Sequence, residues 1–168
     1  MLKKFLSLSI AILPFNRLRI FLYRLLLGYD ITYNSRIGMF NFLCLGKCRI
    51  VAGRVGNFNY INANHFEMAP GSEVRRFNKF RFLNRVTIGR DSVIAVKNSF
   101  TGFGEMVPSL KRYENVTIGE CTIITRRHSF DAVDSITIGD NVTFAGSDIQ
   151  VWTHGFDEKH VRVQSPVT

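Results

Sequence analysis

One histidine of this sequence, His154, lies in a stretch whose residue types could carry out acid–base chemistry, VWTHGFD at 151–157. Imidazole exchanges a proton near neutral pH, so an accessible histidine can serve as general base toward a weakly acidic hydroxyl. A carboxylate can orient such a ring, and Asp157 and Asp131 are candidates that the spacing does not separate. From these residues alone, a surface histidine in a turn is an equally good interpretation.

A second histidine, His128, lies between basic and aromatic residues in the stretch TRRHSFD. Beside Arg126 and Arg127 it could contact an anionic donor or substrate, which makes it a candidate binding residue. A solvated basic corner is the alternative, and the neighbouring cations favour it. The other two histidines, His65 and His160, belong to no motif and are interpreted as surface residues.

The elements that must position these residues are indicated by an internal repeat. An aliphatic residue followed by glycine recurs at Ile37-Gly38, Val55-Gly56, Ile88-Gly89, Ile118-Gly119 and Ile138-Gly139. The first interval is 18 residues, which is three sixes, and hexapeptide periodicity is the signature of a parallel β-helix. Each aliphatic side chain should point inward, and the residue after it should be small because the chain bends there.

Two stretches do not fit this period and are predicted to be loops that leave the coil. One is near 97–115 and contains Gly, Ser and Pro, and the other is near 155–166. The chain then ends in QSPVT, whose last three residues resemble a further copy of the VTIG repeat, so the sequence ends inside a repeat. His154 is expected where a coil ends and a loop begins, within one mostly β domain at 31–168.

The first 30 residues combine long apolar runs with cations. The cations are Lys3, Lys4, Arg17, Arg19 and Arg24. A secretory signal peptide would need a small-residue cleavage site, which is not found, and a transmembrane helix would need roughly 20 uninterrupted apolar residues. We expect two short helices broken near Pro14, with Gly28 ending the second. Segment 1–30 would lie on a membrane surface, cap the β-domain, or do both.

The formal net charge of +9 favours an anionic partner, and the basic N-terminal segment favours an anionic membrane surface. The stretch RRFNKFRFLNR at 75–85 combines five cations with three Phe, as single-stranded nucleic-acid binding would require. The alternation in KFRFL instead indicates an ordinary strand with its cations in solvent. We therefore expect no nucleic-acid partner.

The three cysteines, Cys44, Cys48 and Cys121, are odd in number and too few for a disulfide framework. A reduced, cytoplasmic setting fits them best. We interpret them as buried, inert thiols and expect no metal site, since no second cysteine pair accompanies Cys44 and Cys48.

Residues 31–168 resemble the hexapeptide-repeat acyltransferases of the left-handed β-helix fold. The likeness is to the branch that O-acetylates bacterial surface polysaccharides and their sugar precursors, in lipopolysaccharide or capsule biosynthesis. It is carried by the Ile-Gly repeats, by ITIGDNVTFAG at 136–146 and by VWTHGFD directly after it. The lead-in LPFNRLRIFLYRLLLGYDI also resembles the basic, apolar entry segment of these enzymes.

This resemblance implies direct transfer of an acetyl group from acetyl-CoA to a sugar hydroxyl, with His154 as general base and no acyl-enzyme. Free backbone amides at a coil corner could supply the oxyanion donors, and the small residues at 145–147, with Gly146 and Ser147, allow close approach. Trp152, Asp157 and His128 could contact the carbohydrate acceptor or acetyl-CoA. The family also implies a homotrimer, and we expect a cytoplasmic protein that touches the inner face of the bacterial membrane.

Two other interpretations stay open. In the resembled family, coils after the histidine-bearing loop supply much of the CoA groove, and this sequence stops before them, so a truncated, non-catalytic remnant or scaffold of the same fold is the alternative. A third hypothesis is a metal-dependent hydratase like the gamma-class carbonic anhydrases. It would need three convergent histidines, and the spacing of His128, His154 and His160 does not support them.

Overall fold

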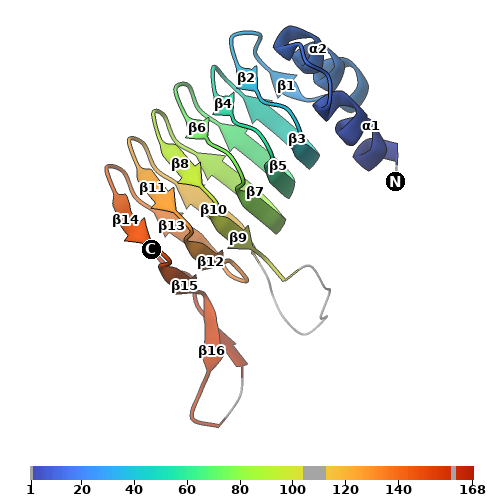
Figure 1. Ribbon diagram of the computed structural model, residues 1–168. Coiled ribbons are helices and arrows are strands. Elements are labelled where there is room, and N and C mark those ends of the chain that lie inside the picture. The colour runs from blue at the N-terminus through green and yellow to red at the C-terminus, as the bar shows by residue number, and fades with distance from the viewer. Residues whose placement is uncertain (1, 104–112, 160–161) are drawn as a thin grey trace.

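The computed structural model describes residues 2–103, 113–159 and 162–168, and it is mostly β. Two N-terminal helices lie at one end of a parallel β-solenoid, as expected (Figure 1). One sheet contains a strand from each of six coils: β2 (Arg36–Ile37), β4 (Arg54–Val55), β6 (Glu73–Val74), β8 (Val93–Val96), β11 (Ile123–Arg126) and β14 (Thr143–Ser147).

A second, nine-stranded sheet forms the rest of the wall. Its strands are β1 (Asp30–Ile31), β3 (Phe42–Ile50), β5 (Tyr60–Met68), β7 (Lys79–Ile88), β9 (Ser99–Thr101), β10 (Asn115–Ile118), β12 (Ser129–Asp131), β13 (Ile136–Ile138) and β15 (Gln150–Trp152). In β3 the alternation of buried and exposed residues breaks at Gly46 and Lys47, which are both exposed, so the strand turns a corner there.

Beyond β7 this sheet divides into two rows. The first half of β7 pairs with β9, which is followed by β12 and β15, while its second half pairs with β10, which is followed by β13. The chain between β9 and β10, residues 102–114, is an insertion between the two rows. The loop predicted near 97–115 is therefore shorter at its start, because 99–101 form β9, and residues 104–112 lie outside the described part of the chain.

The core consists of columns of buried side chains that stack from coil to coil in register. One column is Ile37, Val55, Val74, Ile94 and Ile124, and it ends at the partly buried Phe144. Another is Ile31, Ile50, Met68, Ile88, Ile118 and Ile138. The five Ile-Gly and Val-Gly repeats thus belong to two faces, and the long interval from Val55 to Ile88 does not connect equivalent positions.

The glycine after the aliphatic residue is needed for close approach between coils. A Cβ at Gly38 would lie 2.5 Å from the carbonyl oxygen of Gly56 in the next coil, and one at Gly56 would lie 2.8 Å from the carbonyl carbon of Arg75. Neither glycine has a positive φ. The chain bends directly after both glycines, as expected, and close backbone packing between coils rather than a positive φ excludes a side chain there.

A ladder of buried asparagines fixes another corner of the solenoid. Its rungs are Asn41, Asn59, Asn78 and Asn98. Each side-chain oxygen accepts a hydrogen bond from the backbone N–H of the next rung, at 2.8–2.9 Å. The last of these donors is the N–H of His128, which follows Asn98 in the same row. Because the ladder satisfies buried backbone donors, it ties successive coils together in register.

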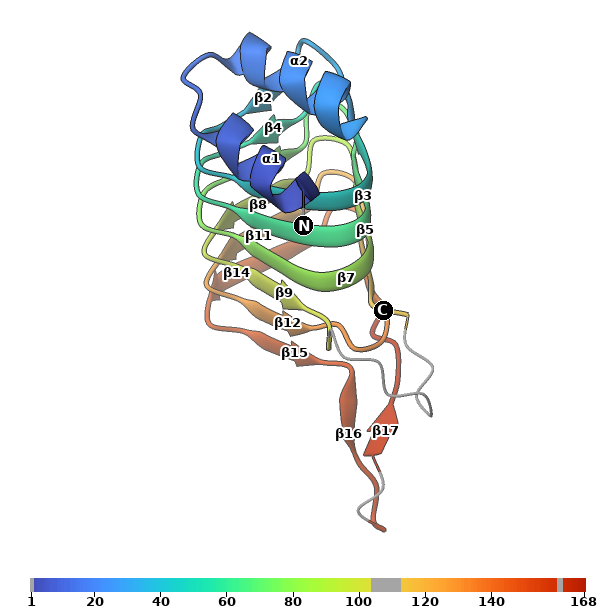
Figure 2. The same cartoon turned by 90° about the vertical axis from the view of Figure 1, so that its right-hand side faces the viewer.

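The N-terminal helices α1 (Leu2–Ala11) and α2 (Asn16–Leu27) cover the first coil (Figure 2). The predicted break near Pro14 and the predicted end at Gly28 are both found, and Gly28 has a φ of 69°. Polar side chains of this segment bond the backbone of the first coil, since no earlier strand is present to do so. The Asn16 side chain donates to Ser35 O at 3.0 Å and accepts from Ile37 N at 2.8 Å.

Two further side chains complete this cap. Arg19 is buried and donates to Ile37 O at 2.6 Å through Nη2, and it also donates to Leu13 O. Tyr29 Oη accepts from Leu45 N at 3.0 Å and donates to Leu43 O at 3.1 Å, while burial raises the pKa of Tyr29 to about 12. A neutral hydroxyl can make both bonds at once. The described residues of segment 1–30 thus pack on the first coil and bond its backbone.

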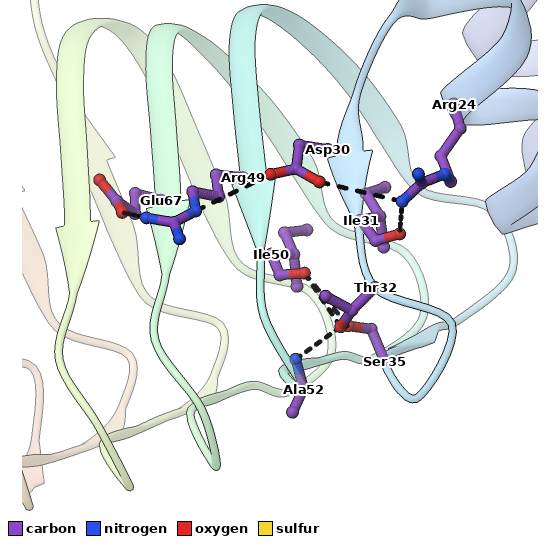
Figure 3. A network of polar contacts seen from close by, with 9 residues as sticks. All are labelled: Arg24, Asp30, Ile31, Thr32, Ser35, Arg49, Ile50, Ala52 and Glu67. Carbon is purple, nitrogen blue, oxygen red and sulfur yellow. Dashed lines mark hydrogen bonds and ion pairs between the residues drawn. The ribbon is translucent and has the colours of Figure 1, made fainter.

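An ionic chain runs from the cap along the outside of the first coils (Figure 3). Arg24 bonds Ile31 O at 2.7 Å and approaches Asp30, Asp30 approaches Arg49, and Arg49 pairs with Glu67 at 3.2 Å. These groups are exposed, so each pair contributes little to stability alone. Together they link α2 to β1, β3 and β5.

The inner phenylalanine stack is predicted to carry much of the stability. Phe80, Phe100 and Phe130 stack at 4.8 and 4.5 Å inside the solenoid, whereas Phe58 stacks with neighbours on the exposed outside. Phe100→Ala should lower the free energy of unfolding by about 3–5 kcal/mol because it leaves a cavity. Phe58→Ala should lower the free energy of unfolding by only about 1 kcal/mol, because Phe58 is exposed and leaves no cavity. Chemical denaturation would measure both, and equal losses would contradict the prediction.

Candidate functional site

His154 begins a hairpin that leaves the last coil of the solenoid (Figure 2). Strands β16 (His154–Phe156) and β17 (Arg162–Gln164) pair in antiparallel fashion, with His154 opposite Gln164. Val167 then forms a parallel bridge with Ile136, which returns the chain to the row of β10 and β13. The stretch predicted as a loop near 155–166 leaves the coil, but its described residues form this hairpin, and residues 160–161 lie outside the described part of the chain. Val167 occupies the position that the repeat-like PVT predicts, and His154 lies at the end of a coil.

Thr153 anchors the base of this hairpin to the coil before it. Only 2% of Thr153 is exposed. Its hydroxyl donates to Asp131 O and accepts from Asp134 N, both at 2.9 Å, and its carbonyl oxygen accepts from Ser165 N at 2.9 Å. Thr153 therefore joins the base of the hairpin to the turn after β12. These bonds fix the backbone position of the next residue, His154.

His154 and Asp131 form a close pair at this place. The ring Nδ1 lies 3.1 Å from Asp131 Oδ1, and both side chains are partly exposed. They meet because Asp131 ends β12 and pairs in register with Trp152, the last residue of β15. If Nδ1 donates to the carboxylate, the other nitrogen, Nε2, carries the lone pair. Within the described residues, no protein group bonds Nε2.

Trp152 forms a wall beside the His154 ring. Its indole is 58% exposed, and the two ring centroids are 5.7 Å apart at an interplanar angle of 74°. A cleft of about 220 Å³ opens between these rings and the returning segment that includes Val163 and Pro166. An imidazole with a free nitrogen and an exposed aromatic face thus border the same space.

Asp157 is close to His154 in the sequence, but in the structure it lies in the turn beyond β16 rather than beside the ring. Its carboxylate accepts a hydrogen bond from Lys159 N at 2.9 Å in the turn beyond β16. The carboxylate that contacts His154 is that of Asp131, 23 residues earlier in the sequence. The structure therefore selects between two candidates that the spacing left equal.

Gly146 and Ser147 are not brought to His154 within one chain. They end β14, and the whole of β15 separates them from the hairpin. The carbonyl oxygen of Gly146 accepts from Thr125 Oγ1 at 2.7 Å, and Ser147 Oγ accepts from Arg127 at 3.1 Å. Arg127 also bonds Asp148 at 2.8 Å, which holds the pKa of that carboxyl below its usual range.

His128 occupies the asparagine ladder rather than a solvated corner, and the corner interpretation is wrong for its ring. Only 1% of the residue is exposed. Its Nδ1 accepts from Ile149 N at 3.1 Å, and its Nε2 lies 3.0 Å from Thr125 Oγ1. With both ring nitrogens bonded inside the protein, neither is available to a ligand. The geometry assigns His128 a structural part.

The histidines and cysteines considered for a metal site or as buried thiols lie apart in the structure. Within the described ranges, no three His, Cys, Asp or Glu side chains gather as a metal site would require. His128 precedes β12 and contacts Ile149 just before β15, whereas His154 follows β15. His160 lies outside the described residues. Cys48 is buried, which raises the pKa of its thiol, but Cys121 is exposed, so the expectation of buried thiols is wrong for Cys121.

Comparison with known proteins gives no relative: no family model, no curated protein and no solved structure matches this chain.

The ladder assignment of His128 predicts a large loss of stability for one substitution and a small loss for another. His128→Ala leaves the partly buried hydrogen-bond donor Ile149 N–H without its acceptor and should lower the free energy of unfolding by about 1–3 kcal/mol. His128→Asn restores the side-chain oxygen of the earlier rungs and should recover most of that loss. Thermal and chemical denaturation would test this, and an Asn variant as unstable as the Ala variant would argue against the ladder role.

Proposed function

We propose that this protein is a CoA-dependent O-acetyltransferase that modifies a sugar hydroxyl of a bacterial surface polysaccharide or its precursor. The observation that carries the proposal is the pairing of His154 with Asp131 at the end of a solenoid coil, beside an exposed tryptophan and a cleft. A parallel β-solenoid is compatible with the hexapeptide-repeat acyltransferases that the sequence resembles.

In the proposed reaction, His154 is the general base. Its Nε2 takes the proton from the sugar hydroxyl as that oxygen attacks the thioester carbonyl carbon of acetyl-CoA. The tetrahedral intermediate then breaks its C–S bond, and the acetyl group stays on the sugar oxygen. The CoA sulfur leaves and receives the proton from the imidazolium. No acyl-enzyme is formed, so no serine or cysteine nucleophile is needed.

Asp131 is proposed as a positioning residue that acts through His154. Its carboxylate holds Nδ1–H at 3.1 Å, which directs Nε2 toward the reacting hydroxyl and stabilises the imidazolium that forms. Asp131 Oδ1 is itself within 3.4 Å of Val133 N. The carboxylate is thus held by the turn after β12 and by the ring together.

Trp152 is proposed to bind the acceptor. Its indole is exposed next to the His154 ring, and an aromatic face packs well against the apolar C–H face of a sugar ring. Such a contact would place a sugar hydroxyl near the imidazole, while Asp157 in the hairpin turn could bond other hydroxyls.

We further propose that the active form is a homotrimer, as the resemblance implies. The cleft of about 220 Å³ beside His154 is smaller than the usual site for a ligand of the size of CoA. Gly146 and Ser147, the expected oxyanion donors, also lie away from His154 in one chain. A neighbouring subunit would supply the missing wall of the donor site. Acetyl-CoA as donor implies a cytoplasmic protein.

The small cleft also favours one alternative, a non-catalytic scaffold of the same fold. In that case His154 and Asp131 would stabilise the hairpin and nothing more. Binding of CoA separates the two functions, because a scaffold has no need of it. Isothermal titration with CoA and with desulfo-CoA would measure this directly.

The acetyl-transfer proposal predicts a large and specific loss on substitution of the base. His154→Ala should lower kcat by about 10²–10⁴-fold while CoA affinity stays within about twofold. Release of free CoA thiol, followed with acetyl-CoA and a panel of nucleotide-linked and lipid-linked sugars, would give the rate. Asp131→Asn should lower kcat less than His154→Ala and should shift the pH profile, since it changes the ring's partner.

His65→Ala, on β5 and away from the hairpin, is the matched control and should leave kcat unchanged. Unchanged turnover in His154→Ala would eliminate this histidine as the base. Absence of both CoA binding and CoA release in the unaltered protein would favour the scaffold.

A further inference from the structure

The helical cap has an exposed apolar outer surface, here named the cap face. It consists of nine large side chains from both helices and the segment between them: Leu2, Phe5, Leu8, Ile12, Phe15, Leu18, Phe21, Leu25 and Leu26. Scattered single apolar residues are normal on protein surfaces, but a group of this size on one short segment marks a site of interaction.

The cap face cannot turn inward to bury itself. The opposite sides of the same helices are already in the core, where Ile10, Ile20 and Tyr23 are buried. Arg19 and Asn16 bond the backbone of the first coil, and the ionic chain of Figure 3 links α2 to the coils below it. The apolar side chains are therefore held outward at one end of the solenoid.

Charge on the cap favours an anionic partner. Lys3, Lys4 and Arg17 are exposed on the same segment, and the first acidic residue of the chain is Asp30. Apolar side chains bordered by cations fit the boundary between acyl chains and phosphate headgroups. A second copy of the chain fits less well, because face-to-face contact would bring the cations of both copies together.

The helices are suited to lie on a bilayer. α1 has 10 residues and α2 has 12, and within the described residues no helix is long and apolar enough to cross a membrane. Short helices with apolar side chains outward and cations at their edges bind in the interface plane.

We propose that the cap face binds the surface of an anionic lipid bilayer, with α1 and α2 in the interface and the solenoid standing away from it. Six strand-to-strand steps separate β1 from β15, which at about 4.8 Å each is roughly 29 Å. The His154 hairpin is at the other end of the stack (Figure 1). The proposal does not depend on the acetyltransferase activity.

Co-sedimentation with vesicles tests this. The full chain should sediment with vesicles of phosphatidylglycerol and phosphatidylcholine in equal amounts and should bind pure phosphatidylcholine more weakly, with a preference that falls as salt rises. Phe5→Ser combined with Leu25→Ser should weaken partitioning by about tenfold or more. Phe156→Ser is the matched control, because Phe156 and Phe5 are both 70% exposed but Phe156 lies on the distant hairpin. It should not change binding.

A second cap variant tests the proposal in case the first variant does not fold. Lys3→Glu combined with Lys4→Glu leaves the apolar side chains in place and should remove the preference for anionic vesicles. Equal losses in Phe156→Ser and the cap variants would overturn the proposal, as would failure of the unaltered chain to bind vesicles. Light scattering would measure self-association. If the cap variants abolish self-association and leave vesicle binding unchanged, the cap face joins copies of the chain and the proposal is wrong.

Discussion

In-register stacking of successive coils is the constraint on which the rest of this structure depends. Each coil packs against the coils next to it, so a residue that faces inward in one coil must fit the same position in the next. The asparagine ladder shows this most directly, because each side-chain oxygen accepts the backbone N–H one coil further on. A rung can change type only if the new side chain keeps an acceptor there, as His128 does with Nδ1.

The candidate site arises where the chain departs from this stacking. β12 and β15 are neighbours in register. After β12 the chain turns within the coil toward β13, whereas after β15 it leaves the coil as the hairpin. Asp131 and the residues after Trp152 are therefore brought together although they are far apart in sequence. The Thr153 hydroxyl bonds the base of the hairpin to the turn between β12 and β13, so the position of His154 is set by the coil as well as by the hairpin.

Much of the fold could be predicted from the sequence because its signals are local. The Ile-Gly repeats, the broken apolar lead-in and Gly28 each report on a few neighbouring residues, and the solenoid, the helices and the C-cap follow from them. Pairing of Asp131 rather than Asp157 with His154 could not be predicted, since it depends on the register between coils. The burial of His128 had a signal that was missed: Asn41, Asn59, Asn78 and Asn98 recur at nearly one-coil intervals, and His128 is the next member once the insertion is removed.

The same stacking relates the two ends of the molecule. The cap replaces a missing coil by bonding the first strand edges with side chains, and it can do so only with its apolar outer residues turned away from the core. Since strand spacing is nearly constant, the number of coils fixes how far the cap face lies from His154. On a bilayer, the roughly 29 Å from β1 to β15, together with the thickness of the helical cap, would hold the cleft above the interface, at the height of an extended headgroup glycan rather than of the lipid phosphate. For the acetyl transfer proposed above, coil number would then help select the acceptor, because a sugar attached closer to the lipid would lie below the imidazole.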